Sequence, residues 1–141
     1  MVLKFPFKKE SSPIFHTIYR PVAKVLFWSE INKNWIAVRM IVDTGADYSL
    51  ADYSLLPRFM ASKLGINLEK DCKIFSTYGV GGQERVYFLP KIKAKLGNWE
   101  RIIPVGFLER NEIPPLMGRH HFFETFETKF SSNHIVSFST K

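Results

Sequence analysis

The sequence contains a single cysteine, Cys72, and this scarcity limits how the fold can be held together. One thiol cannot form an internal disulfide, and it has no cysteine partner for a zinc site. The chain must therefore fold by packing alone. Its 141 residues, 45% of them hydrophobic, suffice for the core of one domain. We expect Cys72 to be a small core residue on a strand.

Long hydrophobic runs are also missing. No stretch of about 18 apolar residues occurs, and the first nine residues lack the apolar segment of a secretory signal. The sequence therefore predicts no membrane span, no membrane partner and a cytoplasmic location.

Basic residues do not form a run interleaved with aromatic residues, although the formal net charge is +7. Lys91, Lys93 and Lys95 alternate with apolar residues, which is typical of the solvent-exposed face of a half-buried strand. Binding of single-stranded nucleic acid needs aromatic stacking platforms beside the positive charge. We therefore expect no nucleic-acid partner, and an RNA-binding β-domain is the least favoured of the functions considered.

The most informative stretch is residues 41–46, which read Ile-Val-Asp-Thr-Gly-Ala. The apolar residues 35–42 predict a strand that ends directly at Asp43. Asp followed closely by Gly is ordinary turn chemistry. No polar spacer separates this carboxyl from Met40, so desolvation would raise its pKa towards a catalytic range. Taken alone, the stretch is compatible with a plain turn or with a functional acid.

The rest of the chain reads mostly as strands. Residues 1–13 form an N-terminal arm of uncertain order, ahead of a domain over residues 14–141. Predicted strands cover 14–29 with an interruption at Pro21, 35–42, 72–78, 86–96 with an edge or bulge at Pro90, 99–107, 116–119 and 135–138. Predicted short helices cover 56–64 and 120–126, and the glycine-rich residues 79–82 form a hairpin tip. This pattern predicts a small mainly β fold, barrel-like or sandwich-like.

Three features occur in order: Asp43-Thr44-Gly45-Ala46 after an apolar strand, the glycine-rich residues 79–82, and Leu116-Met117-Gly118-Arg119 before a short helix. Together they resemble the retropepsin-like aspartic proteases, a single-lobe family of retroviral proteases and free-standing bacterial relatives. The resemblance covers roughly residues 24–138. It implies a closed, barrel-like single lobe with one or two short helices that works as a homodimer.

The resemblance also implies an activity and a site. The activity is hydrolysis of peptide bonds by a water held between two Asp43 carboxylates, one from each subunit. The implied catalytic residues are Asp43, Thr44 and Gly45. The implied substrate-binding residues are Ala46, Asp47, Tyr78, Gly79, Val80, Gly81 and Gly82. Arg119 would support the site or the dimer contact. The partners would be a second copy and a peptide or protein substrate, with no cofactor and no metal.

Two features depart from the family pattern. Residues 46–50, Ala-Asp-Tyr-Ser-Leu, are repeated at once as residues 51–55, which adds five residues after the implied catalytic loop. If this insertion distorts the loop, the chain is a catalytically idle dimerisation or peptide-binding module, and this alternative stays open. His120 and His121 follow the Gly-Arg pair, and neighbours on a helix point about 100° apart, so they are poor joint metal ligands.

Overall fold

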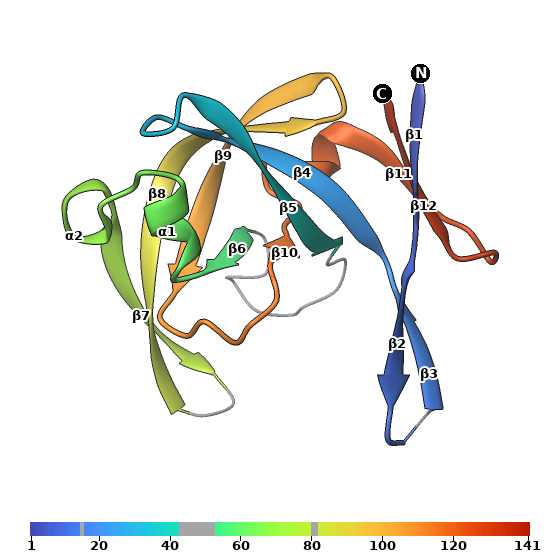
Figure 1. Cartoon of the computed structure of the whole chain (residues 1–141), viewed down its shortest axis with the longest axis horizontal. Coiled ribbons are helices and arrows are strands. Elements are labelled where there is room, and N and C mark those ends of the chain that lie inside the picture. Colours follow the sequence, from blue (N-terminus) through green and yellow to red (C-terminus); the bar gives the residue numbers. More distant parts are fainter. Residues whose placement is uncertain (15, 43–52, 80–81) are drawn as a thin grey trace.

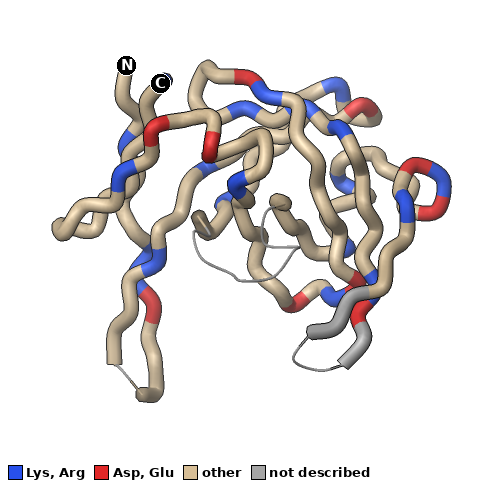
Figure 2. Tube along the Cα trace, turned by 180° about the vertical axis from the view of Figure 1, so that it is seen from behind, with Lys and Arg blue, Asp and Glu red and all other residues tan. Residues whose placement is uncertain are grey.

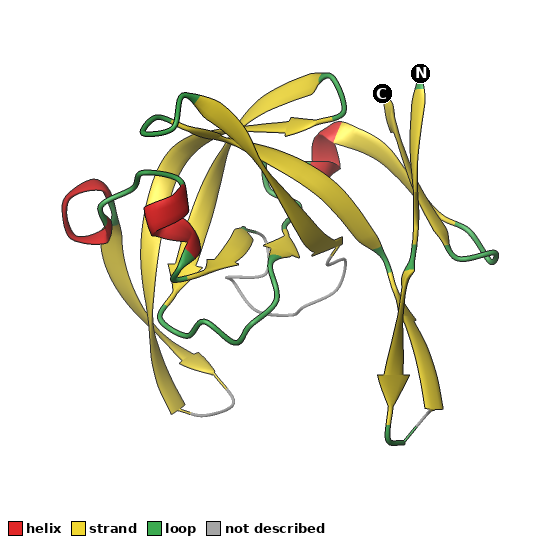
Figure 3. Ribbon diagram, viewed as in Figure 1, coloured by secondary structure: helices red, strands yellow, loops and turns green. Residues whose placement is uncertain are grey.

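The computed structural model describes residues 1–14, 16–42, 53–79 and 82–141, and β-strands dominate these ranges (Figures 1 and 3). Six of the described strands form a barrel. They are β4 (Val22–Ser29), β5 (Asn34–Val42), β6 (Ser54–Pro57), β8 (Gly82–Leu96), β9 (Trp99–Leu108) and β10 (Leu116–Met117).

The barrel follows the order β4-β5-β10-β6-β9-β8 and closes because β8 pairs again with β4. The closing pairs are Leu26 with Lys95 and Phe27 with Ala94. Strand β7 (Lys73–Gly79) extends the sheet beyond β8. The mainly β, barrel-like architecture predicted from the sequence is confirmed.

The β4–β5 hairpin carries the chain to the Asp43 segment. Pro21 separates β4 from β3 (His16–Arg20), as its missing N–H predicts. Strands β4 and β5 then pair over their full lengths, from Val22 opposite Ile41 to Ser29 opposite Asn34. This hairpin and the interruption at Pro21 agree with the prediction.

Pro90 lies where the pairing of β8 with β9 shifts register, between Leu89 and Ile92. A proline cannot donate to a β ladder, so a bulge accommodates it, as predicted. Beyond the bulge, Ile92 and Ala94 face the core while Lys91 and Lys93 are exposed. The alternating lysines therefore lie on the solvent side of a half-buried strand, as the sequence indicates.

The helices are shorter than predicted. Helix α1 (Met60–Lys63) begins after Pro57, because residues 55–57 pair with β9 as part of β6 and this pairing outweighs the helical spacing. Gly65, at a φ of 72°, follows its end as expected. Helix α2 (Leu68–Asp71), which the sequence pattern missed, is capped by Asn67, whose side chain accepts from the backbone N–H groups of Glu69 and Lys70.

The predicted helix over residues 120–126 is wrong in extent. Only η2 (Phe123–Thr125), a single 3₁₀ turn, forms there, and Phe126 already begins β11 (Phe126–Phe130). Phe122, Phe123 and Phe126 are all buried. Phe126 pairs with Thr140 of the last strand, and this pairing ends the turn at Thr125.

The N-terminal residues form strands. Strand β1 (Val2–Pro6) pairs with β12 (Ile135–Thr140), which pairs with β11 on its other side. Strand β2 (Lys8–Ser12) pairs with β3 as a separate hairpin that extends away from the barrel (Figure 1). The division into an arm and a domain at residue 13 stays a prediction.

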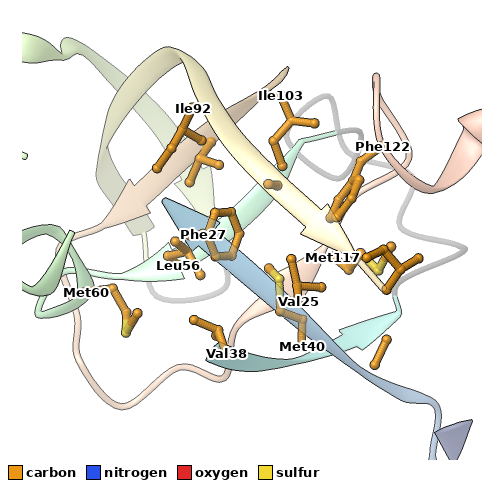
Figure 4. Packing of buried hydrophobic residues seen from close by; sticks show 14 of the residues in the cluster. Val25, Phe27, Val38, Met40, Leu56, Met60, Ile92, Ile103, Met117 and Phe122 are labelled. Atoms are coloured by element: carbon orange, nitrogen blue, oxygen red, sulfur yellow. The ribbon is translucent and has the colours of Figure 1, made fainter. Parts of the chain in front are cut away.

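The core fills the barrel and continues under the sheet of β1, β12 and β11. Phe27 of β4, Val38 of β5 and Leu56 of β6 belong to one buried cluster (Figure 4). Phe5 meets Phe138 edge to face, with ring centroids 6.0 Å apart. This contact ties the N-terminal strand to the same core.

Charges of both signs are spread over the surface of the described chain (Figure 2). Cys72 is half-buried at the end of α2, directly before β7, rather than on a strand as expected. No helix within the described ranges is long and apolar enough to cross a membrane.

Candidate functional site

The end of β5 is fixed from two sides. The backbone N–H of Ile41 donates to the carbonyl oxygen of Pro115 at 2.9 Å, and that of Val42 donates to the carbonyl oxygen of Pro21 at 2.9 Å. Val42 is buried, with 3% of its surface exposed. The chain therefore enters residue 43 from a strand whose last two amides are held.

Strand β10 lies beside the end of β5, and we call these two segments together the frame of the candidate site. It runs parallel to β5, with Met117 opposite Val42, and antiparallel to β6, with Leu116 opposite Leu55. Gly118 therefore follows the residue of β10 that pairs with Val42, the last residue of β5.

Gly118 is held against the first residues of β6. The backbone N–H of Gly118 donates to the hydroxyl oxygen of Ser54 at 3.0 Å, and Ser54 is 1% exposed. A Cβ on residue 118 would lie 2.3 Å from the carbonyl carbon of Tyr53 and 2.6 Å from the nitrogen of Ser54. Only glycine allows this approach, so the glycine in Leu-Met-Gly-Arg is required by packing.

Several residues implied by the resemblance lie outside the described residues: Asp43, Thr44, Gly45, Ala46, Asp47, Val80 and Gly81. Of the implied hairpin, Tyr78 pairs with Gln83 and Gly79 pairs with Gly82, so a long β7–β8 hairpin carries the glycine-rich segment at its end. Arg119 directly follows Gly118, and its carbonyl oxygen accepts from the N–H groups of Phe122 and Glu124 at 3.0 and 3.2 Å. Arg119 therefore lies two residues beyond Met117, the residue of β10 that pairs with Val42.

Polar contacts brace strand β8 of the β7–β8 hairpin. The Glu109 carboxylate accepts from the Tyr87 hydroxyl at 3.1 Å and lies 3.3 Å from a guanidinium nitrogen of Arg58. The pKa of Arg85 is raised, first by its hydrogen bond with Tyr87 and then by the charge of Glu109. Arg110 pairs with Glu84 at 2.9 Å. These contacts join β8 to Glu109 and Arg110 at the start of the segment that leads into β10.

Sequence reasoning missed Ser54 and Tyr53. The Tyr53 ring meets Phe88 and His120 edge to face, with centroids 5.2 and 5.3 Å apart. Both residues belong to the second copy of the repeated pentad, and this copy leads into β6. The repeat was visible, but nothing local distinguishes the copy that joins the barrel.

The two adjacent histidines are closer than a helix would place them. His120 and His121 lie in a turn, their ring centroids are 4.0 Å apart, and His121 has a φ of 57°. The Glu124 carboxylate accepts from the His121 N–H at 3.0 Å and lies 3.9 Å from Nδ1 of His120. Among the residues that the structure describes, no three metal-ligating side chains of His, Cys, Asp or Glu gather into a possible metal site.

The barrel and its short helices have the single-lobe retropepsin-like fold. A solved retropepsin-like aspartic protease from Rickettsia conorii superposes on the chain with a TM-score of 0.62. The match covers 95% of this chain and 97% of that one, at 15% sequence identity. No protein-family model and no curated protein matches the sequence.

Proposed function

We propose that the protein is an aspartic endopeptidase that acts as a homodimer. The observation that carries the proposal is the frame in which β5 ends at Val42, opposite Met117, within a retropepsin-like barrel. The sequence continues from that point as Asp-Thr-Gly-Ala. A carboxyl at the end of a buried, doubly held strand suits chemistry that needs a fixed acid.

The proposed reaction needs two carboxylates, and the chain offers one such motif. A second copy of the chain supplies the other Asp43 across a two-fold axis. Two carboxyls about 3 Å apart share one proton, because both cannot readily ionise together. The ionised Asp43 takes a proton from the bound water, which attacks the scissile carbonyl carbon. The protonated partner donates to the developing oxyanion.

The neighbouring residues have supporting roles in this proposal. Thr44 braces the two loops across the dimer axis, and Gly45 lets the backbones approach. Ala46, Asp47 and the end of the β7–β8 hairpin, residues 78–82, bind an extended peptide as an added strand and exclude water. Arg119 supports the loop or the dimer contact. The cytoplasmic location stays a prediction.

Incubation of the purified protein with a mixed peptide library over a range of pH tests the activity, with Asp43→Asn as the matched control. We expect cleavage between apolar residues by the wild type and no turnover by Asp43→Asn. Equal cleavage by both proteins would reveal a contaminating protease and remove the enzyme proposal.

The repeated pentad favours a second candidate, an idle peptide-binding module with the same fold. In that case neither protein would cleave, and both would bind peptides with the same affinity.

A further inference from the structure

A cavity of about 470 Å³ opens on the outer wall of the barrel, beside the frame of the candidate site. The alternation of β8 and β9 shows that it faces outward, because Ile92 and Ile103 are buried in the core whereas Lys91 and Ile102 are exposed. The cavity falls in the size range of ligand sites in proteins, about 300–1,000 Å³.

The walls of this cavity are mainly apolar. The rings of Tyr53 and Phe88 meet edge to face on one side, and Pro90 and Pro104 also line it. Ile102 contributes an aliphatic side chain that is 60% exposed. These rings and the exposed Ile102 form one apolar surface. Covering it with an apolar ligand group would be favourable, because apolar area would be removed from water.

The rest of the lining carries nitrogen donors. Lys91, His120 and His121 all line the cavity. The one acidic group with contacts to this lining within the described ranges is Glu124, which accepts from the His121 N–H and lies 3.9 Å from Nδ1 of His120. No carboxylate of the described chain lies within ion-pair distance of Lys91. A cation beside an apolar depression is complementary to an anion that carries apolar groups.

The turn that presents the histidines is held in an uncommon conformation. His121 has a φ of 57°, a left-handed value that few residues other than glycine adopt. In this conformation the two imidazoles lie at the cavity with their centroids 4.0 Å apart and their planes tilted by 59°.

The cavity lies close to the end of β10. Tyr53 is both a wall of the cavity and the first described residue after the segment 43–52, and its backbone lies against Gly118. His120 follows Gly118 by two residues. A polypeptide bound beside Gly118 would therefore have a short path to this surface.

We propose that the cavity is a second binding site for the substrate polypeptide, which takes an acidic residue flanked by apolar residues outside the cleft where the peptide bond is cut. This inference rests on the proposed function. The apolar neighbours fill the space between Tyr53, Phe88 and Ile102, while the carboxylate accepts hydrogen bonds from Lys91 and the imidazole of His120.

Binding is tested on the full-length Asp43→Asn protein, so that no cleavage interferes. The probe is the blocked peptide acetyl-Leu-Glu-Phe-Glu-amide, titrated by calorimetry and by amide chemical shifts. Its matched control is the same peptide with Gln in place of Glu. Loss of one charge-assisted hydrogen bond corresponds to about a 5- to 10-fold weaker affinity. We expect that loss for the Gln peptide, for Lys91→Gln and for His120→Gln.

Lys93→Gln is the matched protein control, because Lys93 is exposed on the same strand and does not line this cavity. We expect its affinity to stay within about twofold of the parent, since an exposed charge that makes no direct contact with the ligand adds little. Equal affinity of the Lys91→Gln and Lys93→Gln proteins, or equal binding of the Glu and Gln peptides, would overturn the proposal. Saturation of the cavity by phenylacetate without competition from the peptide would also overturn the proposal. It would assign the cavity to small carboxylic acids.

Turnover separates this inference from the proposed activity. A cleavable core peptide is compared with the same peptide carrying the Leu-Glu-Phe-Glu extension. We expect the extension to raise kcat/KM for the wild type and for Lys93→Gln, mainly through KM, and to lose that advantage in Lys91→Gln. Cleavage without any effect of the extension would refute the second site. Binding without any cleavage would refute the peptidase and leave the cavity as a polypeptide-binding site.

Discussion

Gly118 sets the spacing between β10 and β6 next to residue 43. We expect Gly118→Ala to lower the free energy of unfolding by about 3 kcal/mol, at the upper end of the usual cost of overpacking. The new Cβ would meet the backbone of Tyr53 and Ser54 at 2.3 to 2.6 Å, and backbone atoms yield little. Urea unfolding measures the change.

Gly106→Ala is the control for this prediction. Its Cβ would meet the side chains of Leu55 and Val86 at 2.9 and 3.0 Å. Side-chain ends can rotate away, so we expect a loss of about 1 kcal/mol. A Gly118→Ala protein as stable as Gly106→Ala would contradict the close backbone approach.

Cys72 offers a second test at the scale of single residues. Partial burial, and secondly the charge of Asp71, raise the pKa of its thiol to about 11 from an ordinary 9.0. Because the thiolate is the nucleophile, we expect alkylation of the native protein by iodoacetamide to keep accelerating up to about pH 11. The urea-unfolded chain should reach half of its maximal rate near pH 9.0.

The same shift predicts the sign of a stability change. The folded state holds the thiol proton more tightly than the unfolded state, so the contribution of Cys72 is fully present below pH 9.0 and is lost as pH rises to about 11. Cys72→Ala should therefore show a weaker fall of stability over this interval. An alkylation plateau of the native protein below pH 9.0 would contradict both expectations.

At the scale of elements, strand β1 is held by packing as well as by its pairing with β12. Phe5 is half-buried and meets Phe138, whereas Val2 is 55% exposed. We expect Phe5→Ala to lower the free energy of unfolding by about 2 kcal/mol, less than the roughly 3–5 kcal/mol typical of a fully buried phenylalanine. Val2→Ala should change it by less than about 0.5 kcal/mol. Thermal and urea unfolding of the two variants make the comparison.

A similar effect for Phe5→Ala and Val2→Ala would mean that β1 adds backbone pairing without joining the core.

Elements whose cause is local could be predicted from the sequence. Proline has no N–H to donate, so Pro21 marks a strand boundary and Pro90 marks a bulge wherever the strands lie. The same reasoning fails at Pro57, where the helical spacing of Leu56, Met60 and Leu64 competes with pairing to β9. The strand that pairs with residues 54–57 lies about fifty residues further along the chain. The local spacing of apolar residues carries no information about that partner.

The residues of the candidate site also divide into those that the sequence identifies and those that it does not. The Asp-Thr-Gly-Ala motif and Gly118 carry their own chemistry and could be found from the sequence, although the motif itself lies outside the described residues. Ser54 could not be found, because its importance depends on a hydrogen bond from Gly118, a residue remote in the chain. A serine in a repeated pentad carries no sign of such a contact.

At the scale of the whole molecule, the proposed activity requires two chains. Mixing wild type with Asp43→Asn and allowing subunits to exchange gives a test that does not depend on the substrate. At equal amounts, random pairing leaves about a quarter of the dimers with two Asp43 residues. We therefore expect activity per wild-type chain to fall by about half, measured with any cleavable peptide.

The control is wild type alone, diluted with buffer to the concentration of wild-type chains in the mixture. It measures any loss of activity caused by dissociation of the dimer. Unchanged activity per wild-type chain after complete exchange would show that each chain works alone.

Strand β10 has two residues, and it joins β5 to β6 through only three residue pairs. The barrel wall is therefore held by few residue pairs next to Val42, whereas β8 and β9 pair over most of their lengths. Because so few pairs hold the sheet there, we expect the end of β5 to open locally more often than the rest of the barrel, next to the proposed substrate site. A bound substrate would then reduce this local opening. It would slow hydrogen exchange at the amides of Ile41 and Val42 and make the whole barrel more rigid.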